Sequence, residues 1–145
     1  TWFSSAKLIC WLRHPVDRVI SHYNFWKTYQ KHGNPIHDVF IDQKPSLIEF
    51  VKNPFFFSTV NAYHSFIGSC PPDRFYFIGR TENLNEDLGY LAALMNWKAK
   101  DIQAPLFNKT KDKSPVEPND LKVLTSLLEA EIDIYKRYVA HFHKS

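Results

Sequence analysis

Glycine and cysteine are scarce in this chain of 145 residues, which contains 4 glycines and 2 cysteines. The glycines are scattered, so these residues include no glycine-rich loop of the kind that surrounds a phosphate group in kinases. Cysteines as far apart as Cys10 and Cys70 form neither a disulfide framework nor a zinc site, and we expect two reduced thiols. A P-loop within this sequence and a disulfide-stabilised scaffold are therefore excluded.

Long apolar runs are also absent. No stretch approaches the roughly 20 apolar residues that span a bilayer, so no membrane segment is predicted, and no signal peptide is visible. The charges nearly balance, with 18 Lys and Arg against 15 Asp and Glu and a formal net charge of +3. This small basic excess suits a ligand that carries phosphate or sulfate, but it does not predict a nucleic-acid partner.

The start of the sequence is unusual for a complete domain. It has no initiator Met and begins only a few residues before a segment that we expect to be a core strand. We therefore expect residues 1–145 to be one domain whose N-terminal part is missing. The compartment stays open: cytoplasm for a bacterial host, or the Golgi lumen for a eukaryotic one.

Apolar residues make up 44% of the chain, which is enough to build the core of one domain. Short apolar runs predict buried strands at residues 7–12 and 74–78. Apolar residues at helical spacing predict helices over residues 15–31, 46–51, 118–141 and from Thr81 or Asn83 onward, with Glu86 completing a capping box. Three segments are less regular: 36–44 is ambiguous, 54–68 is partly helical and 98–115 is a loop.

Two strand–helix units with a long helical insert between them predict an α/β fold with a parallel sheet. Ligands of open α/β sheets bind beyond the carboxyl ends of the strands. Residues 13–21 and 79–83 follow the two predicted strands, so a functional site is expected there.

Arg13, Arg18 and Ser21 form the most informative pattern. Arg13 ends the first predicted strand, and Arg18 and Ser21 are three residues apart, so they share a face of the following helix. A helix N-terminus and arginine forks together suit a terminal phosphate without any glycine-rich loop. The spacing alone leaves a second possibility equally open, in which both arginines pair with Asp17 or with other surface acids.

The segment Leu12-Arg13-His14-Pro15, followed by Arg18 and Ser21, resembles the 3′-phosphate motif of PAPS-dependent sulfotransferases of the carbohydrate type. The resemblance implies a P-loop-like parallel sheet with flanking helices, here without its N-terminal strand and 5′-phosphosulfate loop. It implies that Arg13 and Ser21 hold the 3′-phosphate of PAPS or of the product PAP, with Arg18 on the same helix face. His14 stands where the family often has Asp or Asn.

The resemblance continues along the chain. Residues 75–82 are similar to the second core strand and its turn, and residues 133–135 lie in a segment similar to the C-terminal helix of the family. Asn108-Lys109-Thr110 looks like the loop that folds over the nucleotide, which makes Lys109 and Thr110 cofactor-binding candidates. The catalytic base of the family is a Glu or a His, and we expect it upstream of Thr1.

The resemblance implies transfer of a sulfuryl group from PAPS to a hydroxyl of an acceptor, which we expect to be a carbohydrate. Two other functions stay open: another nucleotide-binding α/β protein such as a kinase, and a non-enzymatic module that binds anions or sulfated glycans. None of the 7 histidines has the His-x-x-x-His spacing of a helical zinc site, so no metal site is predicted. His14 is the histidine that could approach a bound phosphate.

Overall fold

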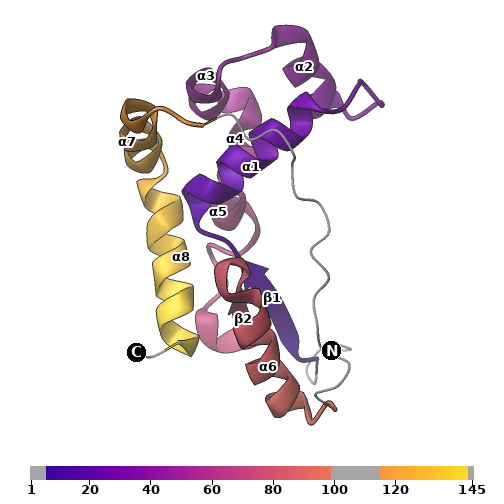
Figure 1. The fold of residues 1–145 in the computed structure, drawn as a ribbon, viewed down its shortest axis with the longest axis vertical. Helices are drawn as coiled ribbons and strands as arrows, with labels where there is room; N and C mark the ends of the chain where they lie inside the picture. Colours follow the sequence, from indigo (N-terminus) through magenta and orange to yellow (C-terminus); the bar gives the residue numbers. More distant parts are fainter. Residues whose placement is uncertain (1–5, 99–114, 144–145) are drawn as a thin grey trace.

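The computed structural model describes residues 6–98 and 115–143, and Figure 1 shows the arrangement of its elements. Within these residues the strands are β1 (Leu8–Leu12) and β2 (Phe75–Arg80). The α-helices are α1 (Pro15–Lys27), α2 (Pro35–Gln43), α3 (Leu47–Lys52), α4 (Phe57–Val60), α5 (Ala62–Phe66), α6 (Leu84–Met95), α7 (Pro118–Leu127) and α8 (Glu129–Phe142). Three 3-10 turns are η1 (Pro54–Phe56), η2 (Pro72–Arg74) and η3 (Thr81–Asn83).

The two strands pair in parallel, with Leu12 opposite Arg80, which confirms an α/β fold with a parallel sheet. The second strand was predicted to stop at Gly79, but it runs through that residue to Arg80. Gly79 lies opposite Trp11, and a Cβ on Gly79 would sit only 2.2 Å from the indole ring. A glycine is therefore needed here for packing, because Trp11 covers the strand where a side chain would otherwise stand.

The junction between α1 and α2 differs from the prediction. The first helix was expected to reach Lys31, but it ends at Lys27, and the hydroxyl of Thr28 donates to the carbonyl of Phe25 at 2.7 Å. Asn34 then caps α2 by accepting hydrogen bonds from the backbone of residues 36 and 37. The Gly33-Asn34-Pro35 sequence thus begins a helix, and the ambiguous segment 36–44 is helical.

Two other helix ends test the capping predictions. The helix predicted to start at Ser46 is present as α3, and Ser46 caps it in a capping box with Glu49 that was not predicted. The capping box predicted for α6 is wrong, because the Asn83 amide binds the Glu86 carboxylate at 3.2 Å and caps no backbone group. The single C-terminal helix predicted for residues 118–141 is also wrong, since the backbone breaks at Leu128 and separates α7 from α8.

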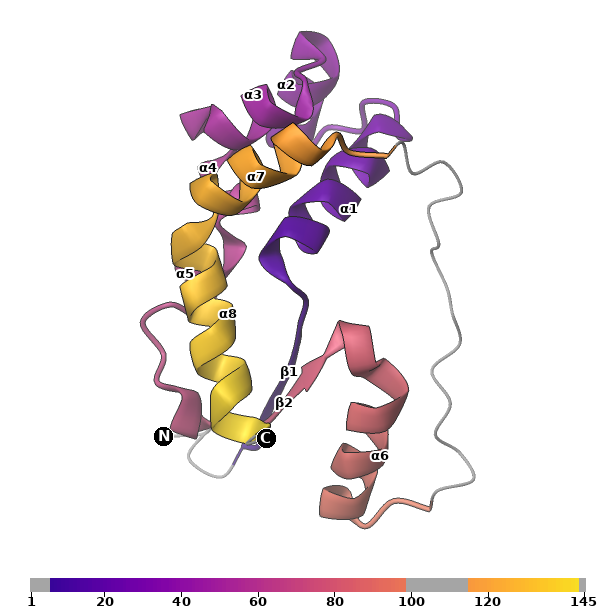
Figure 2. The ribbon, with the colours of Figure 1, turned by 60° about the vertical axis from the view of Figure 1, so that its left-hand side comes forward.

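Two clusters of buried side chains form the core. The larger lies among the helices and joins α1, α2, α3, α4 and α7 through residues such as Val19, Phe50 and Leu124. The smaller lies on the sheet and contains Leu12, Tyr63, Ile78 and Tyr138. Figure 2 shows the sheet between α8 and α6. Within residues 6–98 and 115–143, no helix combines the length and apolar character needed to cross a bilayer.

His22 on α1 makes the folded state sensitive to acid. Burial, together with the nearby charges of Arg18 and His37, lowers the pKa of its imidazole to about 4. The unfolded chain, with a pKa of 6.5, therefore binds more protons than the folded chain between pH 4 and 6.5. Stability rises with pH across this window and falls as the solution is acidified.

We expect acidification from pH 7 to pH 4.5 to cost about 2 kcal/mol through His22 alone. Urea unfolding of the wild-type chain and of His22→Gln at both pH values measures this contribution, and the variant should lose less stability on acidification. His141→Gln, at an exposed histidine, is the matched control and should behave like the wild type. An unchanged pH dependence in His22→Gln would contradict the assignment.

Candidate functional site

The carboxyl ends of β1 and β2 lie at the same edge of the sheet, because the strands are parallel and Leu12 pairs with Arg80. The chain leaves β1 at Arg13 and enters α1 two residues later, and it leaves β2 at η3 (Figure 1). The backbone N–H of His14 donates to the carboxylate of Glu82, which joins the two segments. The regions predicted to hold a site, 13–21 and 79–83, therefore meet at one edge.

The backbone of Arg13 is fixed by a single tyrosine. The Tyr63 hydroxyl accepts the N–H of Arg13 at 2.7 Å and donates to its carbonyl at 2.7 Å. The side chain of Arg13 is half-buried, and within the described ranges it forms no ion pair with an acid. The backbone of Arg13 is thus held in place by Tyr63, whereas its guanidinium at the strand end has no ion-pair partner within the described ranges.

Behind Tyr63 lies a buried carboxylate. Glu131 of α8 is fully buried and accepts the backbone N–H groups of Tyr63 at 2.9 Å and His64 at 2.7 Å. The guanidinium of Arg18 lies 3.7 Å from Glu131 and 5.2 Å from the centre of the Tyr63 ring. These contacts hold α1, α5 and α8 together and fix the tyrosine that positions Arg13.

The side chain of Arg18 binds other groups of the protein itself. Its guanidinium donates to the carbonyls of Thr59, at 3.0 Å, and Val60, at the end of α4. Burial lowers the pKa of Arg18, although Tyr63 and Glu131 oppose this change. These are the contacts of a positioning residue, and a role for Arg18 as a ligand of the cofactor stays a prediction.

The start of α1 offers backbone donors to an anion. No side chain caps this helix at His14, and Pro15 occupies its first position, so the N–H groups of the first turn lack a capping acceptor among the described residues. A helix N-terminus carries a partial positive charge that attracts anions. Ser21 lies half-buried in the second turn of the same helix. The His14 ring packs edge-on against Tyr135, with the ring centres 5.6 Å apart.

The arginine at the end of β2 is neutralised by an acid. Arg80 forms two side-chain hydrogen bonds to the buried Asp87, at 3.0 and 2.8 Å, and His143 lies 3.6 Å from the same carboxylate. Burial would raise the pKa of Asp87, but the hydrogen bonds from Arg80 and the charge of His143 outweigh it, and the net shift is downward. Arg80 therefore offers a bound anion less charge than Arg13 does.

Glu82 introduces a negative charge at the same edge. Besides binding the His14 N–H, it lies close to Tyr135. Burial, together with the charge of Glu82, raises the pKa of the Tyr135 hydroxyl to about 12. Tyr135 thus stays protonated at neutral pH and can donate a hydrogen bond, whereas Glu82 would repel an anion placed directly beside it.

Sequence reasoning proposed Arg13 and Ser21 as site residues but did not identify the residues that pack behind Arg13. Tyr63 was predicted only to lie in the partly helical segment 54–68, and Glu131 was not singled out. A signal for Glu131 does exist: it lies three residues after Leu128, on the apolar stripe of the last helix, where an acid is unusual. Lys109 and Thr110, the remaining candidates, lie outside the described residues.

No protein-family model, curated protein or solved structure matches this chain. The family resemblance therefore rests on the motif residues of the sequence alone.

Proposed function

We propose that this chain binds the 3′-phosphate of PAPS or PAP and belongs to a sulfotransferase domain with a P-loop-like sheet. The observation that carries the proposal is the position of Arg13. It follows the carboxyl end of a parallel strand, its backbone is held by Tyr63, and its guanidinium forms no ion pair within residues 6–98 and 115–143. A half-buried arginine beside an uncapped helix N-terminus suits a doubly charged phosphate.

The role of this site in the proposed reaction is to position the donor. A hydroxyl oxygen of the acceptor glycan attacks the sulfur of PAPS, the bond between sulfur and the 5′-phosphate oxygen breaks, and PAP leaves with that oxygen. A base accepts the hydroxyl proton. Arg13 and Ser21 hold the end of the nucleotide remote from sulfur, and this binding energy orients the reacting atoms.

We expect the chain to bind PAP more tightly than 5′-AMP by roughly one to two powers of ten, because only PAP carries the 3′-phosphate. Calorimetric titrations of both nucleotides at one fixed salt concentration measure the ratio. Inorganic sulfate at the same ionic strength is the control for general anion binding. Equal affinities for PAP and 5′-AMP, or binding of sulfated glycans with no effect of PAP, would favour the non-enzymatic anion-binding module instead.

A further inference from the structure

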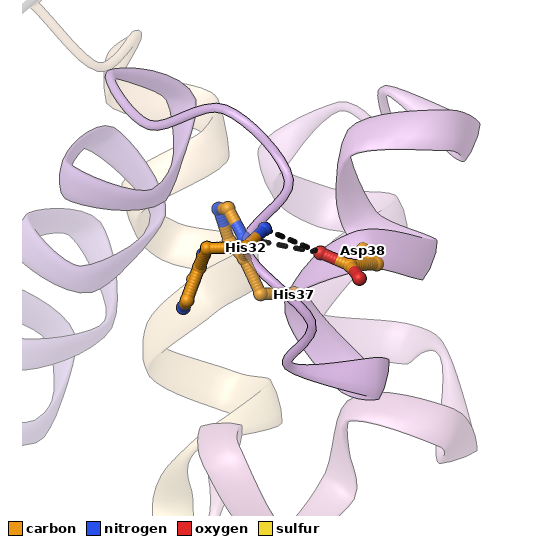
Figure 3. Close-up of side chains that lie close together, drawn as sticks. All are labelled: His32, His37 and Asp38. Carbon is orange, nitrogen blue, oxygen red and sulfur yellow. Dashed lines mark hydrogen bonds and ion pairs between the residues drawn. The ribbon is translucent and has the colours of Figure 1, made fainter.

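Two histidines and an aspartate converge at the junction of α1 and α2, remote from the site described above. His32 belongs to the connecting segment, and His37 and Asp38 lie in the first turn and a half of α2 (Figure 3). One potential ligand atom from each of the three side chains lies within 4.8 Å of the other two. The sequence did not reveal this group, because its histidines are five residues apart and come from a loop and a helix.

The environment of His37 fixes which of its nitrogens can bind a ligand. The residue is only 1% exposed, and its Nε2 lies 3.1 Å from the backbone carbonyl of Trp26. A carbonyl can only accept, so Nε2 carries a proton, and in the neutral ring Nδ1 then presents a lone pair. This is the arrangement of a metal-bound histidine, whose second nitrogen donates to a backbone carbonyl or a carboxylate.

The lone pair of His37 has no partner in the described part of the chain. Nδ1 is buried and forms no hydrogen bond, and the nearest acid oxygen, on Asp38, is 3.9 Å away. A carboxylate cannot donate, and this distance is too long for a hydrogen bond. Burying a hydrogen-bond acceptor without a partner costs free energy. Here Nδ1 of His37 also lies near two further electron-pair donors, the side chains of His32 and Asp38. A cation is the ligand that all three groups can share.

We propose that His32, His37 and Asp38 form a binding site for Zn²⁺, with water as the fourth ligand. Two imidazoles and one carboxylate are ligands that zinc accepts in tetrahedral geometry, with ligand atoms about 3.4 Å apart. The three side chains must therefore approach one another by about 1 Å or somewhat more, which the exposed loop residue His32 can supply. Asp38 already contacts this loop, because it accepts the backbone N–H of His32 at 3.2 Å.

The proposed ion has a structural role. It would tie the segment after α1 to the first turns of α2, where the backbone is otherwise held by the Asn34 cap and the bond from His32 to Asp38. The 13 residues of α1 separate this site from Arg13 by the length of the helix, about 20 Å. The zinc site is therefore independent of the proposed sulfuryl transfer, and the failure of either proposal leaves the other intact.

Titration of the untagged chain with ZnCl₂, in competition with a chelator of known affinity, tests the site. We expect one Zn²⁺ per chain and a melting temperature that rises with zinc concentration. His32→Gln, at an exposed position, should weaken zinc binding by at least about tenfold and abolish the stabilisation. Asp38→Asn should act in the same direction. His64→Gln, at another exposed histidine, is the matched control and should bind zinc like the wild type.

A second measurement distinguishes metal binding at this one tetrahedral site from non-specific metal binding at several surface groups. Co²⁺ bound at the site should give the intense visible absorption of a tetrahedral complex in the wild type, and His32→Gln should lose it. The proposal is overturned if His32→Gln binds zinc as tightly as the wild type. It is equally overturned if His64→Gln and His32→Gln weaken binding to the same extent, or if the wild type binds no zinc.

Discussion

Arg13→Ala is expected to weaken the binding of PAP by roughly one to two powers of ten and to leave the binding of 5′-AMP nearly unchanged. The reason is a charge-assisted contact to the 3′-phosphate worth about 1.5–3 kcal/mol, which 5′-AMP cannot form. Arg13 makes no ion pair within residues 6–98 and 115–143, so its removal breaks no described salt bridge. The substitution should therefore leave stability close to that of the wild type.

Calorimetry with both nucleotides at fixed salt provides the measurement, and two further variants sharpen it. Arg13→Lys should recover only part of the loss, because an ammonium group cannot reproduce the planar fork of donors. Ser21→Ala should cost about 1 kcal/mol in the same direction. Arg74→Ala, at an exposed arginine of η2, is the matched control for a general loss of positive charge and should bind PAP like the wild type.

The comparison of nucleotides separates a specific contact from a general one. If Arg13→Ala weakened PAP and 5′-AMP equally, Arg13 would act through overall electrostatics or structure, and the 3′-phosphate assignment would be wrong. If Arg74→Ala weakened PAP as much as Arg13→Ala, the site would be a diffuse basic surface. Either result would remove the strongest support for the sulfotransferase proposal.

Glu131→Ala is expected to destabilise the fold by about 3–5 kcal/mol, which is the range measured when one partner of a buried ion pair is removed. The fully buried carboxylate accepts two backbone N–H groups at the start of α5 and lies 3.7 Å from the guanidinium of Arg18. Its removal leaves the two backbone donors without an acceptor and the buried guanidinium without its counter-charge. Urea unfolding followed by circular dichroism measures the loss directly.

Two comparisons isolate the buried charge. Asp133→Ala changes an exposed acid on the same helix and should alter stability by no more than about 0.5 kcal/mol. Arg18→Met combined with Glu131→Ala should cost less than the sum of the two single changes, because the double variant leaves no isolated charge. A loss below about 1 kcal/mol in Glu131→Ala would show that the network does not hold these helices together.

The sequence predicted well the features that depend on neighbouring residues. The strand before Arg13, the start of α1 at Pro15 and the start of a helix at Ser46 were all correctly placed, since each depends on a short run of apolar residues or a local hydrogen bond. The parallel pairing of two strands also followed, because strand–helix units connect parallel strands. The position of Arg13 at the sheet edge is a consequence of these local signals.

The features that the sequence did not predict depend on contacts between residues that are far apart in the chain. Glu131 and Tyr63 are 68 residues apart in the sequence, and no local sequence pattern at either residue predicts that they are in contact. The break at Leu128 escaped detection because apolar residues continue at helical spacing through it, while α7 packs on the helical cluster and α8 also on the sheet. The group proposed above as a zinc site was not predicted for a similar reason: a loop, not a single helix, brings His32 beside His37.

The position of Glu131 late in the chain has a consequence for the order of assembly during synthesis. Arg13 emerges from the ribosome before the tyrosine that holds its backbone is anchored, because α8 lies more than a hundred residues later in the chain. Contacts of such long sequence separation form late in folding. A nascent chain therefore cannot present the finished arrangement around Arg13, which is complete only in molecules whose α8 has docked.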